Sequence, residues 1–308
     1  MKRSQQITSV LQAVFVTVLW SSSWVLIKFG LRASLPALTF AGLRYTLAFL
    51  CLAPFVLLSS RNRAAVKSLT RKDWGRLAFL GLIFYTLAQG TLFLSLAYLP
   101  AAMVSLLLNL TAIVVGLFGI VFLREHPSRG QWFGIALTMI GVAVYFFPVD
   151  INGLQMIGLL VALGGVLSNA VSSLLGREAN RLASSSPLIV TFISMGAGSL
   201  LLLIIGVVFQ GFGKLDLQGW LLIAWLAVVN TALAFTLWNQ TLRTLSAVES
   251  SIINNLMMPQ IAILAFVFLG EMLDGREIAG LILVGLGVIV VQMQRKQVVP
   301  AQAQPLEE

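Results

Sequence analysis

Cysteine, histidine and acidic residues are scarce in this sequence of 308 residues. It contains one cysteine (Cys51), one histidine (His126) and 11 acidic residues. A single cysteine cannot form an intramolecular disulfide and cannot supply a thiolate metal cluster. Because Cys51 lies inside an apolar run, we interpret it as a small buried residue. The sequence therefore predicts neither a disulfide framework nor a metal site.

The residues that most enzymes need are also missing. Every Asp and Glu falls in a loop or at the end of an apolar segment, so no carboxylate pair is expected inside the membrane. With one histidine and one cysteine, a hydrolase or a metal-dependent enzyme lacks its acid, base or nucleophile. The sequence has no Walker A motif, which excludes ATP as the energy source. We expect no enzymatic activity, no cofactor and no nucleotide partner.

Apolar residues, in contrast, are abundant along the whole chain. Hydrophobic residues make up 58% of the sequence and charged residues 10%, whereas soluble domains have about 25% charged residues. About 20 mostly apolar residues are needed for one helical crossing of a bilayer. We predict an all-α membrane protein with ten transmembrane helices, which places the lipid bilayer among its partners. The expected spans are Val10 to Phe29, Ala37 to Leu58, Leu77 to Tyr98, Ala101 to Leu123, Gln131 to Phe147, Leu154 to Leu175, Leu188 to Phe209, Trp220 to Leu242, Ala247 to Leu269 and Ile278 to Gln294.

The positive charges indicate the orientation of these spans. A net charge of +9 suggests nucleic acid in a soluble protein, but here the Lys and Arg residues lie mainly in loops between apolar runs. Successive loops must lie on alternating sides of the membrane. On that scheme, the run from Arg61 to Arg76 and most other cations fall on one side, while few fall on the other. The positive-inside rule assigns the richer face to the cytoplasm. We therefore expect no nucleic-acid partner, a bacterial inner-membrane location and both termini in the cytoplasm.

An internal repeat divides the chain into two similar halves. The segment from Ser105 to Val142 matches the segment from Ser251 to Val288 without a gap, at an offset of 146 residues. The match pairs Asn109 with Asn255 and Glu125 with Glu271, among other residues. Each half has five predicted crossings, so the second half must be inserted upside down, as in many secondary transporters. We predict inverted repeats over residues 1–147 and 148–294, followed by a disordered cytoplasmic tail over residues 295–308.

Several short motifs connect this repeat to a known family. They are Trp20-Ser21-Ser22-Ser23 with Lys28, Pro36 followed by Arg44, Phe122-Leu123-Arg124-Glu125, Met258-Pro259 and Phe268-Leu269-Gly270-Glu271. With these motifs the chain resembles the EamA-type exporters of the drug/metabolite transporter superfamily, and most of all bacterial aromatic amino-acid exporters. The resemblance implies ten helices and efflux of amino acids or metabolites. One departure is Ile113, which occupies the position that matches Pro259 and indicates that the two halves bend unequally.

Polar and aromatic residues inside the spans are the candidate substrate contacts, because polar groups in hydrocarbon are costly unless they are paired or face a cavity. Many of them recur at helical spacing on one face. Amides, hydroxyls and ring faces suit a zwitterion with an apolar side chain. The alternative for each Ser or Asn is that it joins helices together. The candidates are Trp20, Ser23, Trp24, Tyr85, Gln89, Ser105, Asn109, Ser168, Asn169, Ser172, Asn230, Trp238, Asn254, Asn255 and Pro259.

Charged residues near the span ends are candidate gates. Lys28, Arg44 and Glu271 fall toward the predicted external face, so one of the cations can pair with the carboxylate. Glu125 and Arg177 hold comparable positions toward the cytoplasm. Such pairs can break as a carrier rocks, or the cations can simply extend to the interface. We favour the second, structural interpretation.

The sequence thus predicts a secondary transporter that exports aromatic or neutral amino acids, or related metabolites, by alternating access. Facilitated export or exchange is the first hypothesis, because no acidic residue or histidine lies at mid-span. A proton-coupled drug or metabolite antiporter is the alternative, and a channel or an intramembrane enzyme comes last. The exact solute and the oligomeric state stay open.

Overall fold

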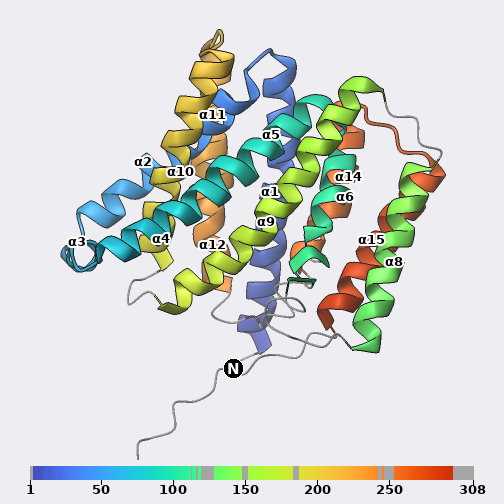
Figure 1. Ribbon diagram of the computed structural model, residues 1–308, viewed down its shortest axis with the longest axis horizontal. Coiled ribbons are helices and arrows are strands. Elements are labelled where there is room, and N and C mark those ends of the chain that lie inside the picture. Colours follow the sequence, from blue (N-terminus) through green and yellow to red (C-terminus); the bar gives the residue numbers. More distant parts are fainter. Residues whose placement is uncertain are drawn as a thin grey trace, which may run out of the picture.

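A computed structural model describes residues 3–111, 113–115, 117–118, 128–147, 152–182, 187–241, 245 and 253–293. All regular elements in this part of the chain are helices (Figure 1). The first half holds α1 (Arg3–Arg32), α2 (Ala37–Leu57), α3 (Ser60–Lys67), α4 (Arg71–Gly81), the π-helix η1 (Leu82–Ala88), α5 (Gln89–Tyr98), α6 (Ala101–Asn109) and α8 (Arg129–Phe146). The second half holds α9 (Gly153–Leu182), α10 (Pro187–Gln210), α11 (Leu217–Ala227), the π-helix η2 (Val228–Leu233), α12 (Ala234–Thr241), α14 (Met257–Leu269) and α15 (Gly275–Met293).

The helix lengths agree with a protein that crosses the membrane several times. Five described helices are long and apolar enough to span a bilayer, and shorter apolar helices include Leu217–Leu233 and Ile253–Leu269. Large apolar side chains such as Phe55, Leu58 and Phe209 are exposed on the outside of the bundle, where lipid takes the place of water as solvent. The predicted count of ten crossings stays a prediction, because residues 119–127 and 246–252 lie outside the described residues.

Local sequence signals explain where several helices begin and end. The Ser59 side chain accepts a hydrogen bond at the start of α3, and Thr70 with Asp73 forms a capping box at the start of α4. These side chains satisfy backbone N–H groups that have no partner within their helix. Gly270 ends α14 with a φ of 68°, a left-handed conformation that glycine adopts without a steric penalty.

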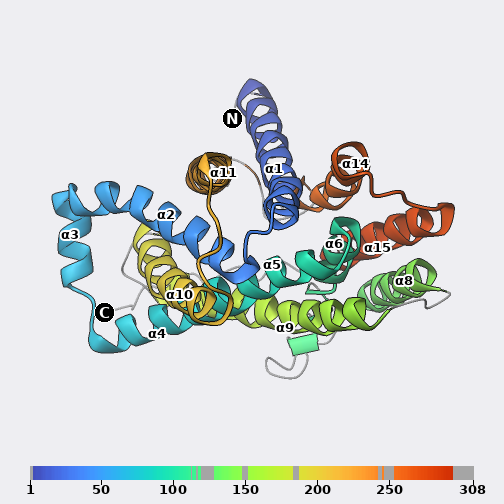
Figure 2. The same cartoon turned by 90° about the horizontal axis from the view of Figure 1, so that it is seen from above.

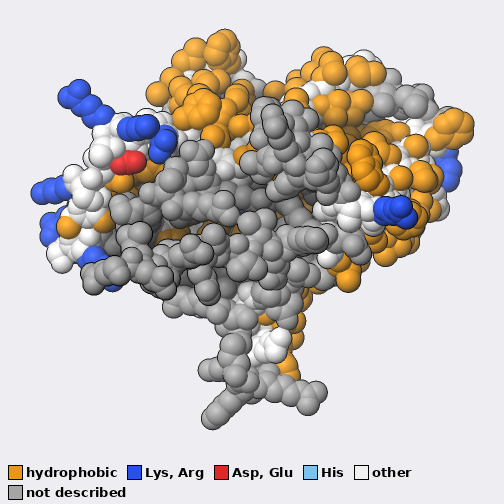
Figure 3. Space-filling view, turned by 60° about the horizontal axis from the view of Figure 1, so that its bottom comes forward, with side chains coloured by type: hydrophobic (Ala, Val, Ile, Leu, Met, Phe, Trp, Pro, Cys, Tyr) orange, Lys and Arg blue, Asp and Glu red, His pale blue; other side chains and the backbone are white. Residues whose placement is uncertain are grey.

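Basic side chains mark one end of the bundle. Figure 3 shows Lys and Arg side chains gathered at the edge of the molecule where α3 and α4 lie. The exposed cations in these two helices are Arg61, Arg63, Lys67, Arg71, Lys72 and Arg76. Their position next to the apolar part of α4 is typical of the boundary between hydrocarbon and water.

Close helix packing depends on glycine at two places. Helices α2 and α10 cross where a side chain on Gly42 would meet the backbone of Leu203, and one on Gly206 would meet the backbone of Thr39. Helices α8 and α15 lie side by side at one end of the bundle (Figures 1 and 2). Small residues allow such backbones to approach closely in a membrane, where interhelical packing takes over from the hydrophobic effect.

The α8–α15 contact is reciprocal. A Cβ added to Gly134 would lie 2.7 Å from the carbonyl oxygen of Gly287, and one added to Gly141 would lie 2.9 Å from that of Gly280. The 146-residue offset relates Gly134 to Gly280 and Gly141 to Gly287. Gly134 thus packs against Gly287, the counterpart of Gly141, and Gly141 packs against Gly280, the counterpart of Gly134. Residues exchange partners in this way across a two-fold axis.

Two π-helical segments stand in the same sequence register. They are η1 in the continuous helix from Arg71 to Tyr98 and η2 in the helix from Leu217 to Thr241. Leu82 begins η1 and Val228 begins η2, and the same 146-residue offset separates these residues. A π-helical turn holds an additional residue, which changes the face that the following side chains present, and it is common at functional sites.

Candidate functional site

Aromatic side chains from α1 and α12 form the first cluster. The Trp20 ring lies 5.2 Å from the Trp238 ring and 5.3 Å from the Phe235 ring, centroid to centroid, in tilted arrangements. Trp20 and Trp238 are both half-buried. Two of the predicted site residues, 218 positions apart in the chain, therefore contact each other directly, and Phe235 joins them.

Asn230 in η2 lies next to this cluster and is fully buried. Its side-chain nitrogen donates hydrogen bonds to the backbone carbonyl of Leu19 and, at 3.2 Å, to the Ser22 hydroxyl. Its side-chain oxygen Oδ1 is buried and has no hydrogen-bond partner among the residues that the structure describes. Buried acceptors of this kind are uncommon in folded proteins and call for an explanation.

Polar residues of α1 also reach α14. The Ser21 hydroxyl donates to Gln260 Oε1 at 3.0 Å, and Gln260 Nε2 donates to the Thr17 hydroxyl at 3.2 Å. Pro259, a predicted site residue, is exposed. Its neighbour Gln260, in contrast, lies on the face of α14 that packs against α1.

Arg44 in α2 is the most deeply placed charge among the described residues, with 5% of its surface exposed. Its Nε donates to the Thr231 hydroxyl at 3.3 Å. Its guanidinium carbon lies 5.1 Å from the Tyr45 ring centroid and 5.9 Å from that of Phe93. The expectation that this cation extends to the interface is wrong, because α2 turns Arg44 toward the aromatic rings inside the bundle.

Tyr45 extends the Arg44 cluster to two predicted site residues. The Tyr45 hydroxyl donates to Gln89 Oε1 at 2.6 Å, and its ring lies 5.5 Å from that of Tyr85. Tyr45 and Tyr85 are buried, and Gln89 is half-buried. Helices α2 and α5, together with η1 and η2, thus surround a polar and aromatic interior.

A second group of charges lies at the other end of α1. Lys28 Nζ is 3.9 Å from Glu271 Oε1 and donates a hydrogen bond to the Leu99 carbonyl oxygen at 2.6 Å. The Glu271 carboxylate accepts hydrogen bonds from the backbone N–H of Ala101 at 2.8 Å and that of Ala102 at 3.4 Å. An anion at a helix N-terminus is favourable for the helix dipole. Of the two cations expected near Glu271, Lys28 is the one that lies beside it.

Several predicted site residues bond within their own helix. In α6, Asn109 donates to the Ser105 carbonyl oxygen, and Ser105 donates to that of Ala102. In α9, three polar side chains donate to backbone carbonyl oxygens of the same helix, three or four residues earlier. In α1, Ser23 likewise donates to the Trp20 carbonyl oxygen. The α9 residues are Ser168, Asn169 and Ser172.

The remaining predicted residues are spread around the bundle. Trp24 is buried in the main apolar core, Asn254 is exposed and Asn255 is half-buried. Arg177 belongs to α9, and its side chain lies outside the described residues, as does all of Glu125. The inner clusters also contain Tyr45, Thr231 and Phe93, which the sequence reasoning missed. Tyr45 adjoins Arg44 and Thr231 adjoins Asn230, so proximity to a polar residue within a span was the available signal.

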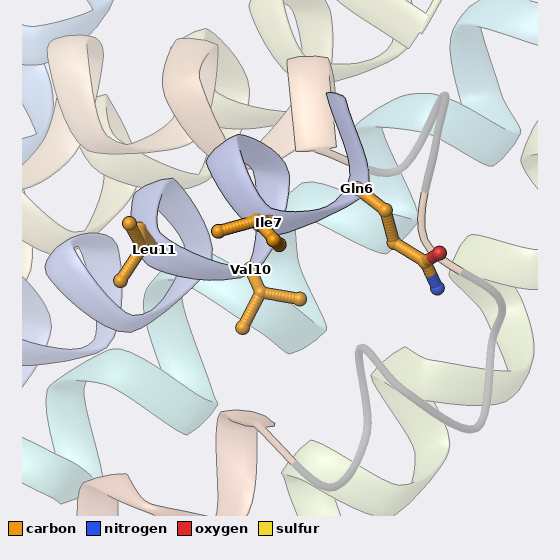
Figure 4. A pocket seen from close by; sticks show the side chains of 4 residues that line it. All are labelled: Gln6, Ile7, Val10 and Leu11. Carbon is orange, nitrogen blue, oxygen red and sulfur yellow. The ribbon is translucent and has the colours of Figure 1, made fainter. Parts of the chain in front are cut away.

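A surface hollow at the beginning of α1 is separate from these clusters. It is lined by Gln6, Ile7, Val10 and Leu11, which all lie on one helix (Figure 4). These residues are mainly apolar, and none of them is a predicted site residue. The inner clusters around Arg44 and Asn230 therefore form the candidate site.

Comparison with known proteins gives the family and several relatives. The model of the EamA-like transporter family matches residues 7–147 and again residues 156–293. A probable amino-acid metabolite efflux pump of Salmonella typhimurium is 27% identical over 90% of this chain and 92% of its own length. A protein of the same description from Escherichia coli is 25% identical over 90% of this chain and 92% of its own.

Two further proteins are similar over nearly the whole chain. The uncharacterized transporter YvbV of Bacillus subtilis is 26% identical over 96% of this chain and 95% of its own length. A protein of known crystal structure superposes with a TM-score of 0.64 at 16% identity, covering 93% of this chain and 98% of its own. At that identity the superposition concerns the fold alone.

Proposed function

The chain belongs to the EamA-like transporter family, and on this basis we propose that it exports aromatic or other neutral amino acids, or related small metabolites, across a bacterial inner membrane. Membership makes it a membrane transporter of small molecules, which is not an enzyme. The observation that carries the proposed substrate is the contact of the half-buried Trp20 and Trp238 rings beside Asn230. Ring faces suit an apolar side chain, and amide groups suit a zwitterionic backbone. Two relatives described as probable amino-acid metabolite efflux pumps support the same choice.

Alternating access is the proposed mechanism, with residues 1–147 and 148–294 as oppositely inserted halves and both termini in the cytoplasm. The reciprocal packing of α8 on α15 supports this arrangement, because glycines related by the 146-residue offset exchange partners. The common register of η1 and η2 supports it as well. Inverted halves have two nearly equivalent conformations, each open to one side, with the substrate held between them.

The Lys28–Glu271 group is the proposed external gate. It joins α1 and the start of α6, which belong to the first half, to Glu271, which lies directly after the Gly270 cap of α14 in the second half. Tilting one half against the other separates these partners and opens the interior to the outside. The repeat register assigns the corresponding cytoplasmic role to Glu125, with Arg177 as its proposed partner.

The proposed mode of transport is facilitated export or exchange. A proton-coupled drug or metabolite antiporter is the second candidate, because the half-buried Glu271 carboxylate would change its contacts with Lys28 and Ala101 on protonation. An imposed pH gradient across proteoliposomes separates the two, since it drives solute accumulation only in the antiporter.

A competition assay tests the proposed substrate. Purified protein is reconstituted in liposomes, and uptake of labelled phenylalanine is measured with each unlabelled amino acid in excess. We expect saturable uptake that aromatic and other neutral amino acids inhibit, and protein-free liposomes provide the background. If phenylalanine is not taken up and no amino acid binds, the proposed substrate is wrong, while the family and the fold are unaffected.

A further inference from the structure

The buried guanidinium of Arg44 is positively charged in a place where the described residues offer no opposite charge. Its described contacts are the Thr231 hydroxyl and the rings of Tyr45 and Phe93. Of its five N–H donors, Nε alone has a hydrogen-bond partner among the described residues. Charged side chains at membrane depth are costly, and those that persist usually pair with an opposite charge or mark a substrate pathway.

The neighbouring π-helix η2 presents the opposite case, a buried atom that can accept a hydrogen bond. Asn230 Oδ1 is a buried acceptor to which no group in the described part of the chain donates. The orientation of the amide is determined by its surroundings, because the nitrogen must face the carbonyl oxygen of Leu19. The oxygen Oδ1 is therefore the amide atom that faces away from the Leu19 carbonyl.

These two groups are connected through neighbouring residues of η2. Asn230 is followed directly by Thr231, whose hydroxyl accepts from Arg44 and donates to the Leu226 carbonyl oxygen at 2.8 Å. Consecutive Cα atoms are about 3.8 Å apart. Within the described ranges, one turn of the π-helix thus connects a cation that has no anionic partner with an acceptor that has no donor. The Trp20, Phe235 and Trp238 rings lie on the Asn230 side, since Leu19 and Trp20 are adjacent in α1.

We propose that Arg44 binds the carboxylate of the transported solute and that Asn230 Oδ1 accepts a hydrogen bond from its ammonium group. The substrate class is then the free α-amino acids, with the side chain against the aromatic rings. Guanidinium binds carboxylate in a planar, two-point geometry, which Lys does not reproduce. This inference rests on the proposed amino-acid export and adds the residues that recognise each end of the solute.

Three ligands of the same shape test the proposal on the unaltered protein. They are phenylalanine, phenylalanine amide, which lacks the carboxylate, and 3-phenylpropanoate, which lacks the ammonium group. We expect both analogues to bind about 10- to 100-fold more weakly than phenylalanine in calorimetric titration of purified protein, the range for loss of a charged hydrogen-bonding partner. Equal binding of phenylalanine and its amide overturns the role of Arg44. If none of the three binds, the proposed amino-acid export fails as well.

Variants assign the two ends of the solute to the two residues. Arg44→Gln should lower the affinity for phenylalanine about 10-fold or more and leave the affinity for phenylalanine amide unchanged. Asn230→Leu should lower the affinity for phenylalanine by a similar factor and leave the affinity for 3-phenylpropanoate unchanged. Lys214→Gln removes an exposed cation remote from the site and should leave all three affinities unchanged. Arg44→Lys retains the charge if Arg44→Gln does not fold, and it should lower phenylalanine affinity less. Folded Arg44 variants with the affinities of the unaltered protein overturn the proposal.

Discussion

At the scale of single residues, the two cations inside the first two helices have different surroundings. Lys28 lies beside Glu271 and a backbone carbonyl, so its charge has a partner. Arg44 lies under two aromatic rings with one hydroxyl as its hydrogen-bond partner among the described residues. Breaking a partly buried ion pair leaves the remaining charge uncompensated. We therefore interpret Lys28 as part of a contact between helices and Arg44 as a residue that binds a ligand.

The Glu271 carboxylate is the residue on which the external gate can be tested. Glu271→Gln removes the charge near Lys28 and weakens the cap on α6, which should lower the free energy of unfolding by about 1–2 kcal/mol. Lys28→Met should be similarly destabilising, and the double variant should cost less than the sum of the two. Thermal unfolding in detergent measures all three. Asp274→Asn, which alters a carboxylate bonded to the exposed Arg276, is the matched control. Additive effects of Lys28→Met and Glu271→Gln would show that the pair is not coupled.

At the scale of helices, glycine and the π-helical turns determine which faces meet. The α8–α15 contact brings carbonyl oxygens within reach of the opposing Cα positions, so the two backbones have no room for a methyl group. In the central helices, η1 and η2 rotate the following residues relative to a regular α-helix. Within η2, Asn230 bonds to α1 and Thr231 bonds to α2 from a single turn.

A pair of alanine substitutions tests the close contact of α8 and α15. Gly141→Ala places a Cβ 2.7 Å from the Val284 backbone nitrogen and should destabilise the protein by about 1–3 kcal/mol. Gly164→Ala in α9 meets no atom within 4 Å, so its higher helix propensity should make it neutral or slightly stabilising, by up to about 1 kcal/mol. Thermal unfolding compares the two variants. Equal stability of both would mean that α8 and α15 are farther apart than the structure indicates.

At the scale of the whole molecule, the two halves of the chain contribute to the same interior. Residues of α1 and α2 meet residues of η2, α12 and α14 in every inner cluster. On the proposed mechanism, a substrate bound there would touch both halves, and a relative tilt of the halves would change its access to each side of the membrane. This is the geometry that alternating access requires.

Cysteine labelling tests the opposite insertion of the halves. Cys51→Ala removes the native thiol, and single cysteines are then introduced as Ser4→Cys near the start of the first half and Asn152→Cys at its junction with the second. In intact cells, a membrane-impermeant maleimide should label position 152 and should reach position 4 only after permeabilisation. Lys67→Cys, in the basic α3, should behave like position 4. Labelling of positions 4 and 152 from the same side would contradict an odd number of crossings in the first half.

The apolar lengths, the resemblance to the exporters and the 146-residue register could all be derived from the sequence, because hydrocarbon imposes a minimum length and a duplication leaves matching residues. The meeting of Trp20 with Trp238 and of Lys28 with Glu271 needed the tertiary structure. A Ser or Asn in a helix can bond its own backbone, as Ser168 does, or that of a neighbour, as Asn230 does. Which of these occurs depends on how each helix is rotated and what packs against it, and on an additional residue in a π-turn. Spacing along one helix does not contain that information, so the burial of Arg44 was decided by the packing of α2 against α5 and η2.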